Sequence, residues 1–189
     1  DYYIEKNPYI LISVDTSEGV GGDNSVATFW QLKLMNIEKA KKFAKINKVT
    51  SILNFVTLEQ IGKFSDNMTP PDKFAKILYW LVTEEMDIET VKLTVEANTF
   101  GGEVIRNLYN VYDDFNEFED GIIIKFPHRF GSNKRYDGNK LNAENKRVYC
   151  NTTKRLIGER KIIPTNPETI QEATFFSRNK KGSYEASTG

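Results

Sequence analysis

The sequence has very little cysteine and histidine, with one of each among 189 residues. Cys150 has no second cysteine to pair with, which excludes an internal disulfide and a cysteine metal site and is typical of an intracellular protein. No apolar run approaches the roughly 18 residues of a membrane span, so no membrane partner is expected. The first residues also lack the basic region and the small-residue cleavage site of a signal peptide.

A phosphate-binding loop is also missing, because no G-x-x-x-x-G-K-[ST] motif occurs. This excludes an ATPase of the P-loop class within these residues. Hydrophobic residues make up 39% and charged residues 28%, as in ordinary globular domains.

Net charge is absent too, since 26 basic residues balance 26 acidic ones. The distribution is uneven: residues 125–161 hold 11 Lys and Arg against 3 Asp and Glu, which leaves 15 against 23 elsewhere. Such asymmetry predicts a basic patch on an acidic body, although a solvated loop and helix face is the simpler alternative.

The hydrophobic pattern predicts an α/β fold. Three opening strands are expected at 9–15, 25–35 and 49–62, with a helix or a long excursion at 36–48. Thr69 is expected to cap a helix over 70–85. The later elements are expected to be a strand at 91–98, a helix from about Gly102, a strand at 120–127, a basic loop at 127–142, a helix from 143 ending near Gly158, a short strand at 161–164, a helix capped by Asn166, and a hairpin at 174–188.

This order predicts a ribonuclease H-like mixed sheet, with an opening antiparallel meander, later parallel strands and flanking helices. The first strand would lie centrally, beside the strand at 91–98. Asp15 and Glu96 each end an apolar run on these two strands, so their side chains are expected to meet at one sheet edge.

Paired carboxylates repel each other unless a cation lies between them. Oxygen ligands suit Mg²⁺ or Mn²⁺, and two such ions about 3.5–4 Å apart can hydrolyse a phosphodiester. Glu18 and Asp23 lie in the glycine turn that follows Asp15. Both are candidates for the same site, and a solvated turn is the alternative for each.

Two motifs, "VDTSEGVGGDNSV" and "VEANTFGGEVIRNL", precede "NAENKRVYCNTTKRLIGERKIIP" and "ETIQEATFFSRNKKGSYEASTG". Together they resemble the C-terminal nuclease domain of the large terminase subunit of tailed bacteriophages, most closely the contractile-tailed type. The resemblance runs from about Tyr9 to Gly189 and implies a single nuclease domain over 1–189 that ends before the family's last helix. It implies that Asp15 and Glu96 are the first and second catalytic carboxylates, with Glu18 and Asp23 in the same acidic turn, and that Asn98 and Gly101 open the following helix.

The third carboxylate of that family follows the glycine that Gly189 matches, in an Asp-Asp pair outside this sequence. The resemblance implies a metal-dependent DNA endonuclease that cuts concatemeric viral DNA during genome packaging and leaves a 3′-hydroxyl. It further implies Mg²⁺ or Mn²⁺ as cofactor, and double-stranded DNA, an upstream ATPase domain, the small terminase subunit and the portal as partners. The place of action would be the host cytoplasm, at the procapsid.

Contacts to the DNA backbone are expected from the basic segment, in a manner tolerant of sequence and sensitive to salt. The candidates are Lys134, Arg135 and Lys140 in the predicted loop, and Lys146, Arg147, Lys154 and Arg155 on the following helix.

Two other functions fit parts of the pattern. A catalytically inactive ribonuclease H-like module would bind DNA or a motor partner without cutting. An actin-like ATPase also begins with a strand, an acidic residue and a glycine turn, but it needs two such halves, and only one acidic glycine turn is present.

Overall fold

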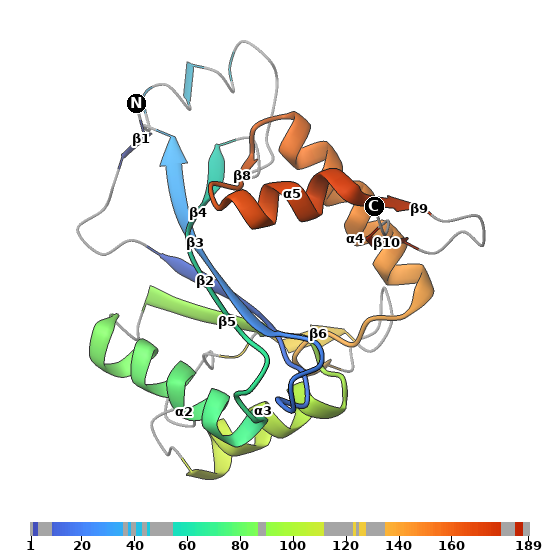
Figure 1. Cartoon of the computed structure of the whole chain (residues 1–189). Helices are drawn as coiled ribbons and strands as arrows, with labels where there is room; N and C mark the ends of the chain where they lie inside the picture. Colours follow the sequence, from blue (N-terminus) through green and yellow to red (C-terminus); the bar gives the residue numbers. More distant parts are fainter. Residues whose placement is uncertain are drawn as a thin grey trace. The chain divides into compact units, whose positions relative to one another are not determined.

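A computed structural model describes residues 2–3, 9–35, 38, 41–42, 45, 55–86, 90–111, 123, 125–127, 135–178 and 184–186. The chain is an α/β protein whose principal sheet is mixed (Figure 1). By their contacts the residues group into two compact units, one of 10–29 and 62–141 and the other of 1–9, 30–61 and 142–189. The single domain expected from the sequence stays a prediction.

The sheet has the strand order β5-β2-β3-β4-β8, and β1 (Tyr2–Tyr3) pairs with β3. The opening strands β2 (Ile10–Asp15), β3 (Ser25–Met35) and β4 (Val56–Asp66) are consecutive neighbours. β5 (Val91–Val95) lies parallel to β2, and β8 (Ile162–Ile163) lies parallel to β4. The predicted pairing of the first strand with the strand at 91–98 is therefore confirmed, and β2 has a neighbour on each side, β5 and β3.

The unit of residues 10–29 and 62–141 has an apolar core. β2 and β5 alternate between buried and half-buried residues, as strands with one face on a core should. α2 (Pro71–Trp80) and α3 (Thr99–Val111) pack on that buried face and on each other (Figure 1). Each fully buried large side chain contributes about 1.5–3 kcal/mol to the folding free energy; the largest from these four elements are Ile12, Phe74, Leu78, Leu93 and Leu108.

The other unit contains most of the chain's C-terminal elements. They are α4 (Ala143–Gly158), β8, α5 (Pro167–Phe175) and the antiparallel pair β9 (Phe176–Arg178) and β10 (Tyr184–Ala186). Its buried centre is the polar side chain of Gln60, whose Oε1 accepts hydrogen bonds from the backbone N–H groups of Thr165 and Asn166. Asn166 caps α5 as predicted, since its Oδ1 accepts from the N–H groups of Glu168 and Thr169.

Several predicted boundaries are confirmed, including the whole of β3 and the end of α4 at Gly158. Others shift by a few residues. β4 continues four residues beyond the expected end at Gly62, and its expected start lies outside the described residues. α3 begins at Thr99 rather than near Gly102, because the side chain of Asn98 supplies the cap.

Two local interpretations are wrong. Thr69 does not cap α2; its hydroxyl donates to the carboxylate of Asp66 and Pro70 is the N-cap residue. Within the predicted basic loop, β7 (Arg135–Asp137) forms a two-stranded sheet with β6 (Lys125–Pro127). The helix or excursion at 36–48 and the tip of the C-terminal hairpin lie largely outside the described residues. None of the described helices has the length and apolar character needed to cross a membrane.

Candidate functional site

The site begins at the parallel pairing of β2 and β5. Five residue pairs are in register, the last being Val14 beside Val95, and the backbone N–H of Glu96 donates to the carbonyl of Val14 at 2.8 Å. Asp15 and Glu96 are the next residues on the two strands. Adjacent strands lie about 4.8 Å apart, so regular pairing carries the two carboxylates to neighbouring positions.

The two carboxylates lie on the same face. Val14 and Val95 are buried, at 2% and 0% exposure, against the α2 and α3 side of the sheet. Because successive side chains alternate, Asp15 and Glu96 both lie on the opposite face, with Asp15 exposed and Glu96 half-buried. The two residues therefore share a face of the sheet, and the convergence of their carboxylates on a cation stays a prediction.

A third backbone segment, at Asn139, pairs with the chain at the end of β5. This residue forms a parallel bridge with Glu96: its N–H donates to the carbonyl of Val95 at 2.6 Å, and its carbonyl accepts from the N–H of Ala97 at 2.9 Å. Asp15, Glu96 and Asn139 therefore occupy successive places across one sheet edge. Asn139 was missed by the sequence interpretation, which placed it in a loop.

Gly138 is the sequence signal that points to this close approach. Its φ is +76°, and a Cβ there would lie 2.7 Å from the carbonyl oxygen of Val95 and 2.9 Å from Cδ1 of Ile105. Only glycine fits both the backbone conformation and the space. The dipeptide Gly138-Asn139 therefore marks a strand edge where the sequence indicated only a turn.

Asn98 and Gly101, which follow Glu96, hold the backbone at Glu96 close to the first turn of α3. The Asn98 Oδ1 accepts from the N–H of Gly101 at 2.7 Å, and the Asn98 Nδ2 donates to the carbonyl of Thr16 at 3.4 Å. A Cβ on Gly101 would lie 1.9 Å from the carbonyl oxygen of Glu96. Asn98 and Gly101 thus tie the ends of β2 and β5 to the first turn of the helix, as expected for residues that open it.

The conformation of the glycine turn after Asp15 is stabilised by contacts and hydrogen bonds of its backbone. Gly19 and Gly21 have φ values of +75° and +89°, and the N–H of Gly21 donates to the carbonyl of Asn67 at 2.8 Å. A Cβ on Gly19 would lie 2.4 Å from the carbonyl oxygen of Thr69. The hydroxyl of Ser25 also accepts from the N–H of Ser17 at 3.1 Å, so the turn is closed at its base.

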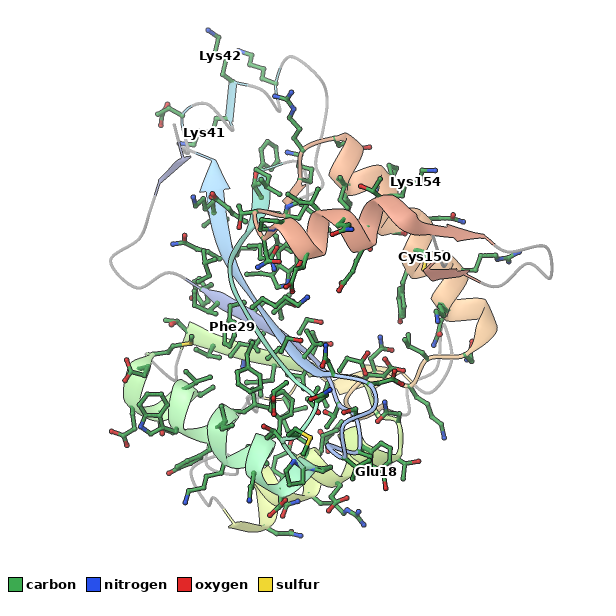
Figure 2. The ribbon with its side chains drawn as sticks, viewed as in Figure 1. Glu18, Phe29, Lys41, Lys42, Cys150 and Lys154 are labelled. Carbon is green, nitrogen blue, oxygen red and sulfur yellow. The ribbon has the colours of Figure 1, made fainter. Side chains whose placement is uncertain are left out.

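Glu18 and Asp23 are exposed in this turn, where Figure 2 labels Glu18. Across the part of the chain that the structure describes, no three or more His, Cys, Asp and Glu side chains are grouped so as to hold a metal ion. Glu18 and Asp23 therefore do not complete such a group with Asp15 and Glu96. The catalytic role expected for them stays a prediction.

A tyrosine tethers the Asn139 segment to α3. The Tyr109 hydroxyl donates to Oδ1 of Asp137 at 3.2 Å. Burial raises the pKa of Tyr109 to about 12, and the negative charge of Asp137 and this hydrogen bond add to the effect. The phenol therefore stays neutral over the physiological range and keeps its donor.

The predicted DNA contacts divide between the two units. Lys140 is exposed and directly follows Asn139, in the unit that holds the carboxylates. On α4, Arg147 and Lys154 are exposed and Lys146 is half-buried (Figure 2 labels Lys154), whereas Arg155 forms an ion pair with Glu159 at 2.9 Å.

The structure says less about the two remaining predicted DNA contacts, Lys134 and Arg135. Lys134 lies outside the described residues, and Arg135 is placed only by its backbone in β7. Cys150, also on α4, is half-buried, and burial raises the pKa of its thiol, with Lys146 opposing the shift. A thiol kept protonated in this way is a poor nucleophile.

Comparison of the chain with protein-family models and with curated proteins finds no match.

Proposed function

We propose that this chain is the metal-dependent nuclease domain of a large terminase subunit from a tailed bacteriophage of the contractile-tailed type. Its reaction would be endonucleolytic cleavage of concatemeric double-stranded DNA. The observation that carries the proposal is the pairing of β2 with β5, which brings Asp15 and Glu96 to neighbouring places on one face. The mixed sheet, with β2 beside β5, is compatible with the ribonuclease H-like architecture that the resemblance implies.

The residues of this edge fit a hard divalent cation. Two carboxylates on adjacent strands repel each other in the absence of positive charge, and their oxygens are the ligands that Mg²⁺ and Mn²⁺ prefer. The backbone N–H of Glu96 donates to the carbonyl of Val14, and Asn139 is hydrogen-bonded to Val95 and Ala97 on either side of Glu96. A cation would therefore meet ligands on a rigid sheet rather than on a loop.

Asp15 and Glu96 would hold the ion or ions, which when bound supply an activated water and stabilise the leaving oxygen. Asp15 is the exposed last residue of β2, where a DNA backbone would approach. Asn98 caps α3, and the missing side chain of Gly101 lets the first turn of α3 approach the Glu96 carbonyl closely. By the resemblance, a third carboxylate would come from residues that follow Gly189 in the family.

The basic residues would supply the electrostatic part of DNA binding. Lys140, Lys146, Arg147 and Lys154 would contact phosphates without reading sequence. Arg155 would contribute less, because Glu159 already neutralises its charge. By the same resemblance, the partners would be an upstream ATPase domain, the small terminase subunit and the portal, and the reaction would take place at the procapsid in the host cytoplasm.

Plasmid nicking tests the proposal. The purified chain is incubated with supercoiled DNA and Mg²⁺ or Mn²⁺, and Asp15→Asn is compared with Asp72→Asn, an exposed carboxylate on α2. We expect nicking by the wild type and by Asp72→Asn, and a loss of about 100-fold or more in Asp15→Asn. Equal nicking by the wild type and Asp15→Asn would refute the assignment of the site.

A DNA-binding module without nuclease activity is the second candidate. It is favoured by the lack, within the described ranges, of a group of three acidic or other ligating side chains. Metal-independent DNA binding together with no nicking under any metal would support this function over the first.

A further inference from the structure

Asn139 is the third member of the row formed by Asp15 and Glu96, and nothing in the proposed reaction yet uses it. We infer that Asn139 contacts the substrate, with its side-chain amide donating a hydrogen bond to a backbone phosphate of the DNA beside the cleaved bond. The inference rests on the proposed function, because it takes the DNA to lie across the Asp15 and Glu96 edge.

The face on which Asn139 lies follows from two independent observations. It bridges Glu96 in parallel register, and bridged residues share a face of the sheet. Its neighbour Gly138 lies toward the opposite side, where an added Cβ would meet Ile105 of α3. Asn139 is therefore on the side of the carboxylates, away from the apolar core.

The backbone holds Asn139 firmly in this place. Its N–H and its carbonyl are both hydrogen-bonded to β5 and its extension, at 2.6 and 2.9 Å. Two residues earlier, Asp137 accepts the hydrogen bond from Tyr109 of α3. A polar side chain on a fixed backbone loses little conformational entropy when it binds, which suits a residue that orients a substrate.

The chemistry of an amide favours a phosphate contact. A DNA backbone approaching Asp15 and Glu96 meets two negative charges, so a neighbouring group that donates hydrogen bonds without adding negative charge offsets part of the repulsion. The Asn Nδ2 has two N–H donors, and asparagine is among the side chains that bind phosphate oxygens. The exposed Lys140 that follows adds positive charge to the same segment.

DNA binding in the absence of metal tests the inference. The dissociation constant for a fluorescein-labelled duplex is measured by anisotropy in EDTA for the wild type, Asn139→Ala and Asn139→Asp. Asn110→Asp, an exposed asparagine on α3, is the matched control for added charge. We expect affinity to fall about 3- to 10-fold in Asn139→Ala and further in Asn139→Asp, with Asn110→Asp close to wild type. Asn139→Asp keeps the shape of the side chain, so its circular dichroism melt serves as the check on folding.

Three results overturn the inference. Binding of DNA by Asn139→Asp as tight as that by Asn110→Asp would rule out the phosphate contact. Unchanged DNA affinity in Asn139→Ala, together with a loss of Mn²⁺ affinity by calorimetry, would make the side chain a metal ligand instead. A wild-type chain that binds no DNA removes the inference outright. Failure of the proposed function is a separate result, because Asp15→Asn would then nick DNA as the wild type does.

Discussion

The two units of this chain are stabilised in different ways. All the fully buried apolar side chains that the structure describes lie in the unit of residues 10–29 and 62–141, behind the Asp15 and Glu96 edge. In the other unit, the buried side chains within the described ranges are polar, Thr57 at 1% and Gln60 at 2% exposure. The carboxylates therefore stand on a close-packed apolar layer, which would resist displacement if a cation or DNA binds there as proposed.

The hydrogen bonds around Gln60 give the other unit its local order. Its side chain binds Thr165, Asn166 and Thr169, and its carbonyl accepts from the Thr165 hydroxyl at 2.7 Å. One buried side chain thus fixes the start of α5 against β4. Such a hydrogen-bond network contributes less to the folding free energy than apolar burial does. It specifies more strictly which residues come into contact, because each donor needs its acceptor.

The largest effect is expected from a truncation in the apolar core. Leu93→Ala removes a fully buried side chain on β5 and should lower the free energy of unfolding by about 2–5 kcal/mol. Ile61→Ala, on β4 in the other unit, is the control, because Ile61 is 51% exposed and should change stability by about 0.5 kcal/mol or less. Urea denaturation followed by circular dichroism measures both. Similar losses in the two variants would remove the contrast between the units.

A smaller effect is expected from Gln60→Ala. The change leaves the backbone N–H groups of Thr165 and Asn166 without their acceptor, which should cost about 1–3 kcal/mol. Hydrogen exchange should show the loss at the first turn of α5, with protection of β2 and β5 retained. Gln171→Ala, at an exposed position of α5, is the matched control and should leave exchange unchanged. Loss of protection throughout both units would contradict the separate roles given to them.

The sequence predicted the regular strands of the sheet well. Short apolar runs identified β2, β3 and β5, and the placing of Asp15 and Glu96 followed from the order of the strands. These features depend on local periodicity and on common rules of sheet topology. The prediction succeeded where one face of each strand had to be buried.

Contacts between residues far apart in the sequence could not be predicted in the same way. Asn139 joins β5 by backbone hydrogen bonds, which any residue type makes, and its polar neighbours resembled those of a loop. The binding of α5 by Gln60 spans more than 100 residues and leaves no periodic signal. The error at Thr69 has a local cause instead, because the carboxylate of Asp66, three residues earlier, takes the hydroxyl that would otherwise cap the helix.

The smallest effect is expected at the tether between Tyr109 and Asp137. The raised pKa of Tyr109 means that its contribution to stability is complete below pH 10, the ordinary value, and is lost as the pH rises through about 12. Tyr109→Phe removes the hydrogen bond and should cost about 0.5–1.5 kcal/mol at neutral pH. Thermal melts between pH 8 and 12 measure the trend, which should be steeper in the wild type than in Tyr109→Phe. Parallel pH profiles for the two proteins would show that the tether contributes nothing.

In the proposed function, Asp15 and Glu96 act together on one divalent cation. Calorimetric titration of Mn²⁺ into the wild type, Asp15→Asn, Glu96→Gln and the double variant tests it most directly. We expect each single change to lower Mn²⁺ affinity by about tenfold or more. We expect the double change to cost less than the sum of the two free-energy losses, because both changes remove the same site. Mn²⁺ affinities in the single variants equal to that of the wild type would contradict it.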